Sequence, residues 1–256
     1  MNIDKSDYYP ESLLDDEEED KEEIEEVEET SPEPHDPVKI SGEPEPEADS
    51  ETERCVTGFA HFLSWVLVPM FMPVFGIILC FGLTILNFTN FGTRLAFTAI
   101  TAAFNIVAPM IVILLLKRFG FIKDVGLNEQ KERLVPYLVC IVCLVGTAIF
   151  MYFKGAPVWL AMFFFGGAAA GVVEVIINKW WKISVHAAGI AGIVALLLYL
   201  LQFQFTLPAT RTWLLITIGA AGLLGSARIW LGRHTLWQVL AGYAVGFCAV
   251  YFLMFV

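Results

Sequence analysis

Acidic residues are almost absent beyond residue 54 of this 256-residue chain. Residues 55–256 hold only four of the 27 aspartates and glutamates, against 12 of the 16 lysines and arginines. This part therefore carries a formal charge of +8, whereas the whole chain carries −11. Because its acids are few and scattered, no group of Asp, Cys and His has the spacing of metal ligands. We expect neither a metal nor another cofactor.

The sequence also lacks the features of a signal peptide and of a transporter. The N-terminus is acidic and has no apolar core, so we expect no cleaved signal peptide. Clear internal repeats and paired half-broken helices are missing, which argues against a transporter. We expect no nucleic-acid partner.

The excess of acid is concentrated at the beginning of the chain. Residues 1–54 hold 23 acidic and four basic residues and include the stretch DDEEEDKEEIEEVEE. Charge repulsion, few apolar residues and repeated proline all oppose a packed core. We predict a disordered acidic tail over 1–54. Two roles are compatible with this composition: the tail could solvate the chain, or it could bind a protein partner.

The remainder, residues 55–256, has the composition of a membrane protein. Hydrophobic residues make up 57% of the chain, and its mean hydropathy is +0.65. Isolated strands cannot cross lipid, and a helix needs about 20 apolar residues to do so. We predict an all-α integral membrane domain, a bundle of six or seven transmembrane helices. The apolar runs lie at roughly 57–87, 95–116, 134–153, 158–178, 186–204, 212–230 and 236–256.

Seven spans fix which loops lie on the same side of the membrane. The first run contains Pro69 and Pro73, so its early part is expected along the interface before the chain crosses at about 68–87. The loops after the second, fourth and sixth runs share the side of the N-terminus. They hold nine lysines and arginines, and the opposite loops hold three. The positive-inside rule then predicts a multi-pass protein of the bacterial inner membrane with a cytoplasmic tail, although a basic binding site would raise this count by itself.

The stretch SARIWLGRHTLWQVLAG, residues 226–242, places costly polar residues at a membrane boundary. His234 and Gln238 are four apart and share a helix face, so Gln238 could accept from Nδ1–H of His234 and present Nε2 outward. Six helical steps would separate Arg228 from His234 by about 120°. Gly232 permits a break between them, so the guanidinium and the imidazole could face one phosphate.

Two further polar clusters precede apolar runs. In KISVHAAGIAG, His186 follows Ser184 at a helix start, where anions are favoured and a histidine could protonate a leaving group. In LNEQKERLVPYLV, Lys131 and Arg133 could bind phosphate oxygens. Simpler interpretations stay open: a polar helix end for His186, ordinary positive-inside residues for Lys131 and Arg133, and a lipid-phosphate anchor for Arg233.

Other residues of the apolar runs also have two interpretations. Glu174 is an intramembrane acid and thus a functional candidate, although a structural hydrogen bond would explain it equally well. Cys140 and Cys143 have redox spacing, but a buried and inert pair is the expectation. Two glycine pairs have the GxxxG spacing of close helix contacts, within the chain or in a dimer. They are Gly167 with Gly171 and Gly242 with Gly246.

These clusters resemble the signatures of the type 2 phosphatidic acid phosphatase and haloperoxidase superfamily, of which the chain would be a divergent member. Its third signature, Ser-Arg-x5-His-x3-Asp, often continues as Val-Leu-Ala-Gly. Arg228 and His234 keep this spacing, and VLAG follows. ISVH resembles the second signature, Pro-Ser-Gly-His, and QKERLVPY falls where the first, Lys-x6-Arg-Pro, belongs. The resemblance covers roughly residues 60–256.

The resemblance implies a metal-independent membrane phosphatase for a lipid phosphate or an isoprenyl pyrophosphate. His234 would attack phosphorus and become a phosphohistidine, His186 would protonate the leaving group, and Gln238 would orient His234. The phosphate-binding residues would be Arg228, Arg133, Lys131 and Ser184.

Departures from the signatures support an alternative function. Gln238 stands where the family has aspartate, Gly126 where it has lysine, and Val185 where it has glycine. An amide can fix a histidine tautomer but cannot stabilise imidazolium as a carboxylate does, and a comparable loss in a protease triad costs about 10⁴ in rate. The alternative is a weak or inactive family member that acts as a lipid-binding or interaction membrane protein.

Overall fold

The computed structural model describes residues 51–120 and 134–256. Most of the predicted tail, 1–54, therefore lies outside the described residues. Its last four residues do not: they form the first turn of α1, so the first helix begins at Glu51, before the boundary predicted at residue 55. The described part is helical throughout and contains no regular strand.

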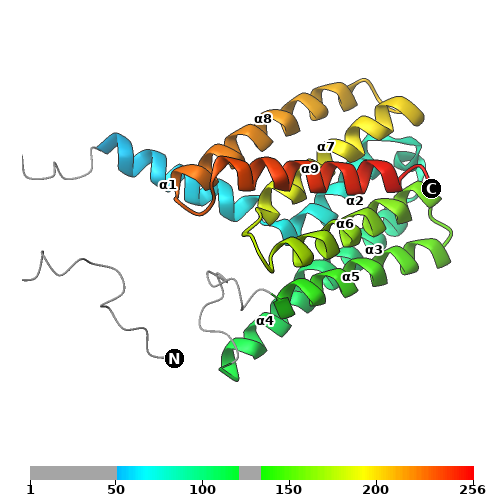
Figure 1. Ribbon diagram of the computed structural model, residues 1–256. Coiled ribbons are helices and arrows are strands. Elements are labelled where there is room, and N and C mark those ends of the chain that lie inside the picture. Colours follow the sequence, from blue (N-terminus) through cyan, green and yellow to red (C-terminus); the bar gives the residue numbers. More distant parts are fainter. Residues whose placement is uncertain (1–50, 121–133) are drawn as a thin grey trace, which may run out of the picture. The chain divides into compact units, whose positions relative to one another are not determined.

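The described helices form seven membrane spans. Each span is long and apolar enough to cross a bilayer. The first consists of α1 and α2, the second of α3 and α4, and each of the others of one helix, from α5 to α9. The predicted all-α, multi-pass membrane fold is thus confirmed, with helices that run alongside one another (Figure 1). Their bounds are α1 (Glu51–Val66), α2 (Met72–Leu83), α3 (Phe91–Ala102), α4 (Ala108–Arg118), α5 (Leu134–Phe153), α6 (Val158–Ile177), α7 (Val185–Phe203), α8 (Ala209–Trp230) and α9 (Leu236–Leu253).

Irregular turns interrupt the first two spans. A 3₁₀ turn over Pro69–Phe71 separates α1 from α2, and a π-helical turn over Ala103–Val107 joins α3 to α4. The start of the first run lies in α1, which packs against α8, and its position along the interface stays a prediction. There Nε1 of Trp230 donates to Oγ1 of Thr57 at 3.1 Å.

Local signals set the ends of the later helices. Gly155 after α5 and Gly232 after α8 have φ of 73° and 61°, which glycine adopts without strain. The side chains of Ser184 and Thr235 cap the first turns of α7 and α9. These stops and caps give the short connections that place consecutive helices next to one another.

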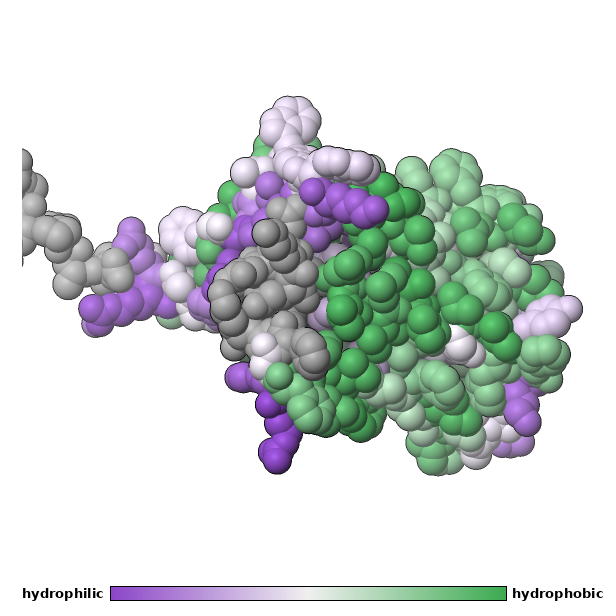
Figure 2. Space-filling view, turned by 60° about the horizontal axis from the view of Figure 1, so that its bottom comes forward, coloured by the Kyte–Doolittle hydropathy of each residue, from purple (hydrophilic) through white to green (hydrophobic). Residues whose placement is uncertain are grey.

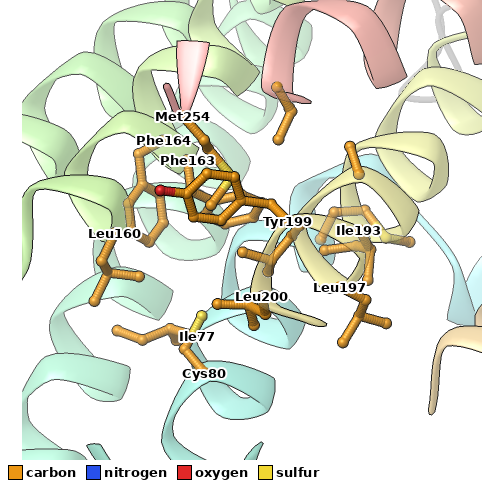
Figure 3. Packing of buried hydrophobic residues seen from close by; sticks show 14 of the residues in the cluster. Ile77, Cys80, Leu160, Phe163, Phe164, Ile193, Leu197, Tyr199, Leu200 and Met254 are labelled. Atoms are coloured by element: carbon orange, nitrogen blue, oxygen red, sulfur yellow. The ribbon is translucent and has the colours of Figure 1, made fainter. Parts of the chain in front are cut away.

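Helix α7 is the most buried span and lies at the centre of the bundle. Its buried side chains pack with those of α2 and α6 in one core, which includes Ile77, Phe164 and Leu197 (Figure 3). Helix α9 packs along α7, and α6 packs along both α5 and α9. Because these faces are entirely apolar, small residues decide how closely the helices approach.

Both GxxxG pairs lie at helix contacts within the chain, one of the two predicted alternatives. A Cβ added to Gly242 or Gly246 would collide with the backbone of α7, at Ser184 and Ala188 respectively. In the other pair, a Cβ on Gly171 would come within 2.8 Å of Cγ1 of Ile141 in α5. The glycines therefore allow α9 to contact α7 and α6 to contact α5 closely.

One end of the bundle gathers the polar clusters. The start of α1, the end of α4 and the α6–α7 and α8–α9 connections lie on the same side of the bundle, opposite the C-terminus (Figure 1). For the described residues, this confirms the side that seven spans predict for these segments. We call it the polar end; beyond it the surface is largely apolar (Figure 2). Exposed tryptophans, which favour membrane interfaces, lie in the segments at this end. They are Trp180, Trp181, Trp230 and Trp237.

Candidate functional site

A cavity of about 550 Å³ lies among the spans, within the size range of small-molecule sites. Its wall is mostly apolar and includes Leu144, Phe163 and Ile193. Three of the predicted site residues line this cavity, although they come from different segments: His186, Arg228 and His234. Asn105, Tyr137 and Glu174 are among the other residues with polar groups in its lining.

The turn after α8 brings Arg228 and His234 to the same cavity. Arg228 lies in the last turn of α8, and the chain then reverses at Gly232. The backbone N–H groups of Arg233 and His234 both donate to the carbonyl oxygen of Arg228, at 3.1 and 3.3 Å. The predicted break between Arg228 and His234 is therefore confirmed, and it removes the angular separation that a continuous helix would impose.

The predicted pairing of His234 with Gln238 is also confirmed, but not the shared helix face, because His234 precedes the N-cap Thr235 of α9. Nδ1 of His234 lies 3.1 Å from Oε1 of Gln238, and the imidazole is buried, with 8% of the residue exposed. The backbone N–H of Thr235 donates to the same oxygen at 3.2 Å, as part of a capping box. A backbone N–H requires an acceptor, so the amide must present its oxygen here. Nδ1 of His234 therefore carries the proton, and in the neutral ring Nε2 carries the lone pair.

His186 lies in the first turn of α7 and contacts α1. Its Nε2 is 3.3 Å from the carbonyl oxygen of Ser64 and donates to it. In the neutral ring the lone pair is then on Nδ1, and in imidazolium both nitrogens carry a proton. This contact holds the α7 histidine against the first span, at the wall of the cavity.

Ser184 has a structural position. It is fully buried, it is not among the residues that line the cavity, and its Oγ accepts from the backbone N–H of Ala187 at 3.5 Å as the cap of α7. Its own N–H donates to the backbone carbonyl of Gln238 at 3.3 Å. Ser184 thus ties the segment that carries His186 to the segment that carries His234. The contact with phosphate that the resemblance implies for Ser184 has no support in this geometry.

Of the remaining predicted residues, Lys131 and Arg133 lie outside the described residues. Arg233 is exposed and does not line the cavity, as expected for a boundary anchor. His61 is also exposed and does not line the cavity. In the part of the chain that the structure describes, no three His, Cys, Asp or Glu side chains are close enough together to hold a metal ion.

Sequence reasoning missed Asn105 as a cavity residue. It is buried in the π-helical turn, and such turns are frequent at functional sites. Its Nδ2 donates to the carbonyl of Thr101 at 2.9 Å and to Oγ1 of Thr147 at 2.8 Å. The sequence feature that could have indicated Asn105 is a single amide side chain inside an apolar run. Glu174, which the sequence did single out, is 4% exposed and lines the same cavity.

This chain matches no protein-family model, no curated protein and no solved structure. The resemblance to the phosphatase signatures therefore rests on the motifs themselves. Any function has to be argued from the cavity and its residues.

Proposed function

We propose that the protein is a membrane-embedded phosphatase that hydrolyses a lipid phosphate or an isoprenyl pyrophosphate through a phosphohistidine intermediate. One observation carries the proposal. His186, Arg228 and His234 come from separate segments and line one cavity at the polar end of a membrane bundle. An apolar cavity with a few cationic and proton-carrying groups suits a substrate with a charged head and a hydrocarbon tail.

The geometry around His234 supports a role as the nucleophile. Because Gln238 holds the proton of His234 on Nδ1, the lone pair of Nε2 can attack phosphorus. The guanidinium of Arg228 would bind the phosphate oxygens and stabilise the charge that develops on them. As the N–P bond forms, the bond from phosphorus to the leaving oxygen breaks.

The second histidine would serve as the acid. Nε2 of His186 is engaged with the carbonyl of Ser64, so the leaving oxygen would take its proton from Nδ1 of the protonated ring. Water would then attack the phosphohistidine with His186 as base. This step releases inorganic phosphate and restores His234.

The setting of this enzyme follows from the same proposal. The polar end would face the cytoplasm of a bacterial inner membrane, as the excess of lysine and arginine in its loops indicates. The substrate would be a lipid that enters from the bilayer. The acidic tail would then be cytoplasmic and free to bind a protein partner.

A lipid-binding or interaction protein without turnover is the second candidate. One observation favours it: Oε1 of Gln238 accepts from the backbone of Thr235 as well as from His234. The amide thus has a capping role that it would keep without catalysis, and it adds no negative charge beside the imidazole.

Phosphate release by the purified protein in detergent, without added metal, separates the two candidates. Phosphatidate, phosphatidylglycerol phosphate and undecaprenyl pyrophosphate are the substrates to test. We expect release that is abolished in His234→Ala and retained in His61→Ala, a matched control at an exposed histidine outside the cavity. Absence of release above the His234→Ala background on all three substrates would favour the binding protein.

A further inference from the structure

Glu174 is a buried acid that has no role in the hydrolysis proposed for His234 and His186. It lies in α6, three residues before Ile177 at the helix end, about 5 Å along the axis. It is 4% exposed and lines the cavity. Its Oε1 is buried and has no hydrogen-bond partner among the residues that the structure describes. Buried polar atoms are nearly always paired in proteins, and because this one lines the cavity, an occupant of the cavity is the partner we consider.

Other buried polar side chains of the bundle show how Glu174 differs. The hydroxyl groups of Thr101, Thr147 and Thr217 each donate to the backbone carbonyl four residues earlier, at 2.8 Å. Oε1 of Glu174 makes no such bond: a carboxylate oxygen cannot donate to a carbonyl, and as the hydroxyl of a protonated carboxyl it has no described acceptor either. The structural hydrogen bond that would explain Glu174 as a packing residue is not formed at Oε1 by any described residue.

A second polar group lies in the same wall. Asn105 lines the cavity from the junction of α3 and α4, and both of its hydrogen bonds in the described structure use its amide nitrogen. A cavity meant only for hydrocarbon would gain nothing from a carboxyl and an amide in its lining. Both groups suit an occupant that has hydrogen-bonding atoms of its own beyond the phosphate.

Candidate substrates differ in this respect. A glycerol-based lipid phosphate has ester or hydroxyl groups a few bonds from the phosphorus, whereas an isoprenyl phosphate continues as hydrocarbon. If the phosphate binds at Arg228 and His234, the adjoining part of the lipid occupies the cavity that Glu174 lines. An isoprenyl chain would leave the carboxyl oxygen unpaired. A glycerol backbone would pair it, because the protonated carboxyl can donate to an ester oxygen and the carboxylate can accept from a hydroxyl.

We propose that Glu174 hydrogen-bonds to the polar backbone of the bound lipid and thereby selects glycerol-based lipid phosphates over isoprenyl phosphates. This inference rests on the proposed binding of lipid phosphates at His234 and Arg228. Glu174 is then a specificity residue that takes no part in the transfer of phosphate.

Binding of phosphonate analogues, which cannot be hydrolysed, tests this directly. Dissociation constants of a short-chain phosphatidate phosphonate and of farnesyl phosphonate are measured calorimetrically in detergent with the full chain. The quantity of interest is the ratio of the two constants. One hydrogen bond is worth up to a factor of about ten. We therefore expect Glu174→Leu to shift the ratio about tenfold toward the isoprenyl analogue.

Three further variants make the result specific. Glu174→Gln offers N–H donors to an ester oxygen in place of the carboxyl O–H and should keep most of the ratio. Glu174→Met repeats the apolar change if Glu174→Leu does not fold. Thr210→Val is the matched control, because Oγ1 of Thr210 is also buried without a partner among the described residues but lies outside the cavity. It should leave the ratio at the wild-type value.

The outcomes separate this inference from the proposed function. An unchanged ratio in both apolar variants, or equal weakening of both analogues, would overturn the specificity role. Failure of the wild type to bind either phosphonate would overturn it as well. Because the analogues are not turned over, the ratio tests Glu174 even if phosphate release fails.

Discussion

Replacement of Gln238 by glutamate changes one property of the site. Glutamate has the same length, so a carboxylate oxygen would take the place of Oε1, which accepts from Nδ1 of His234 at 3.1 Å. Glutamate is also compatible with the capping box at Thr235. Helix α9 and the histidine tautomer should therefore persist. The added element is a negative charge beside an imidazole that becomes positive as Nε2 bonds to phosphorus.

The size of the effect follows from this geometry. The amide already fixes the tautomer, so the loss of about 10⁴ seen when a protease triad loses its aspartate is an upper limit. What remains is the difference between a neutral and a charge-assisted hydrogen bond, about 1 to 1.5 kcal/mol. This corresponds to roughly a five- to tenfold rise in the rate of phosphorus attack. Gln238 is only partly buried, which limits the desolvation cost of the new charge.

Single-turnover phosphate release from a lipid phosphate is the assay. Gln238→Glu should be faster than the wild type, and Gln238→Ala should be slower because the imidazole loses its acceptor. Thr235→Ala controls for weakening of the cap, since it removes the hydroxyl that accepts from the N–H of Gln238 at 3.4 Å. Equal rates in the wild type, Gln238→Glu and Gln238→Ala would show that Gln238 does not orient the nucleophile.

Three other predictions concern charge, packing and metal. Arg228→Lys should lower kcat/KM about tenfold, because an ammonium lacks the planar fork that binds two phosphate oxygens. An equal loss in Arg233→Lys, at an exposed arginine, would contradict the binding of phosphate by Arg228. Gly246→Ala should destabilise the fold by about 1–3 kcal/mol through overlap with Ala188. Thermal unfolding in detergent measures this, and Gly219→Ala, with no atom within 4 Å of the added Cβ, should not lower the midpoint. EDTA should leave phosphate release unchanged, and a loss that Mg²⁺ restores would contradict the metal-independent mechanism.

Hydropathy was sufficient to predict the spans. The run predicted at 134–153 has the bounds of α5, and the run at 158–178 differs from α6 by one residue. The contact of His234 with Gln238 was also predicted, but not for the right reason: His234 precedes the N-cap Thr235 of α9, and the capping box turns the Gln238 amide back toward it. Such features depend on the chain over a few neighbouring residues, and the sequence states them directly.

The cavity could not be predicted in the same way. Apart from a few polar residues such as Glu174 and His186, α6 and α7 are apolar around their circumference, so hydropathy does not show which face lies inside. The position of Asn105 in a π-helical turn and the lack of a partner for Oε1 of Glu174 depend on how several spans pack together. The role of Ser184 as a helix cap similarly became visible only from its burial and its hydrogen bonds.

The central claim is that His234 becomes phosphorylated, and rapid trapping of that species tests it most directly. The purified protein is mixed with a lipid labelled with ³²P at the phosphate, quenched in alkaline detergent, digested and analysed by mass spectrometry. We predict a phosphate on His234 that is stable to alkali, labile to acid and missing from His234→Ala. Phosphate release with the label on another residue, or with no labelled protein at any time during the first turnover, would contradict this mechanism.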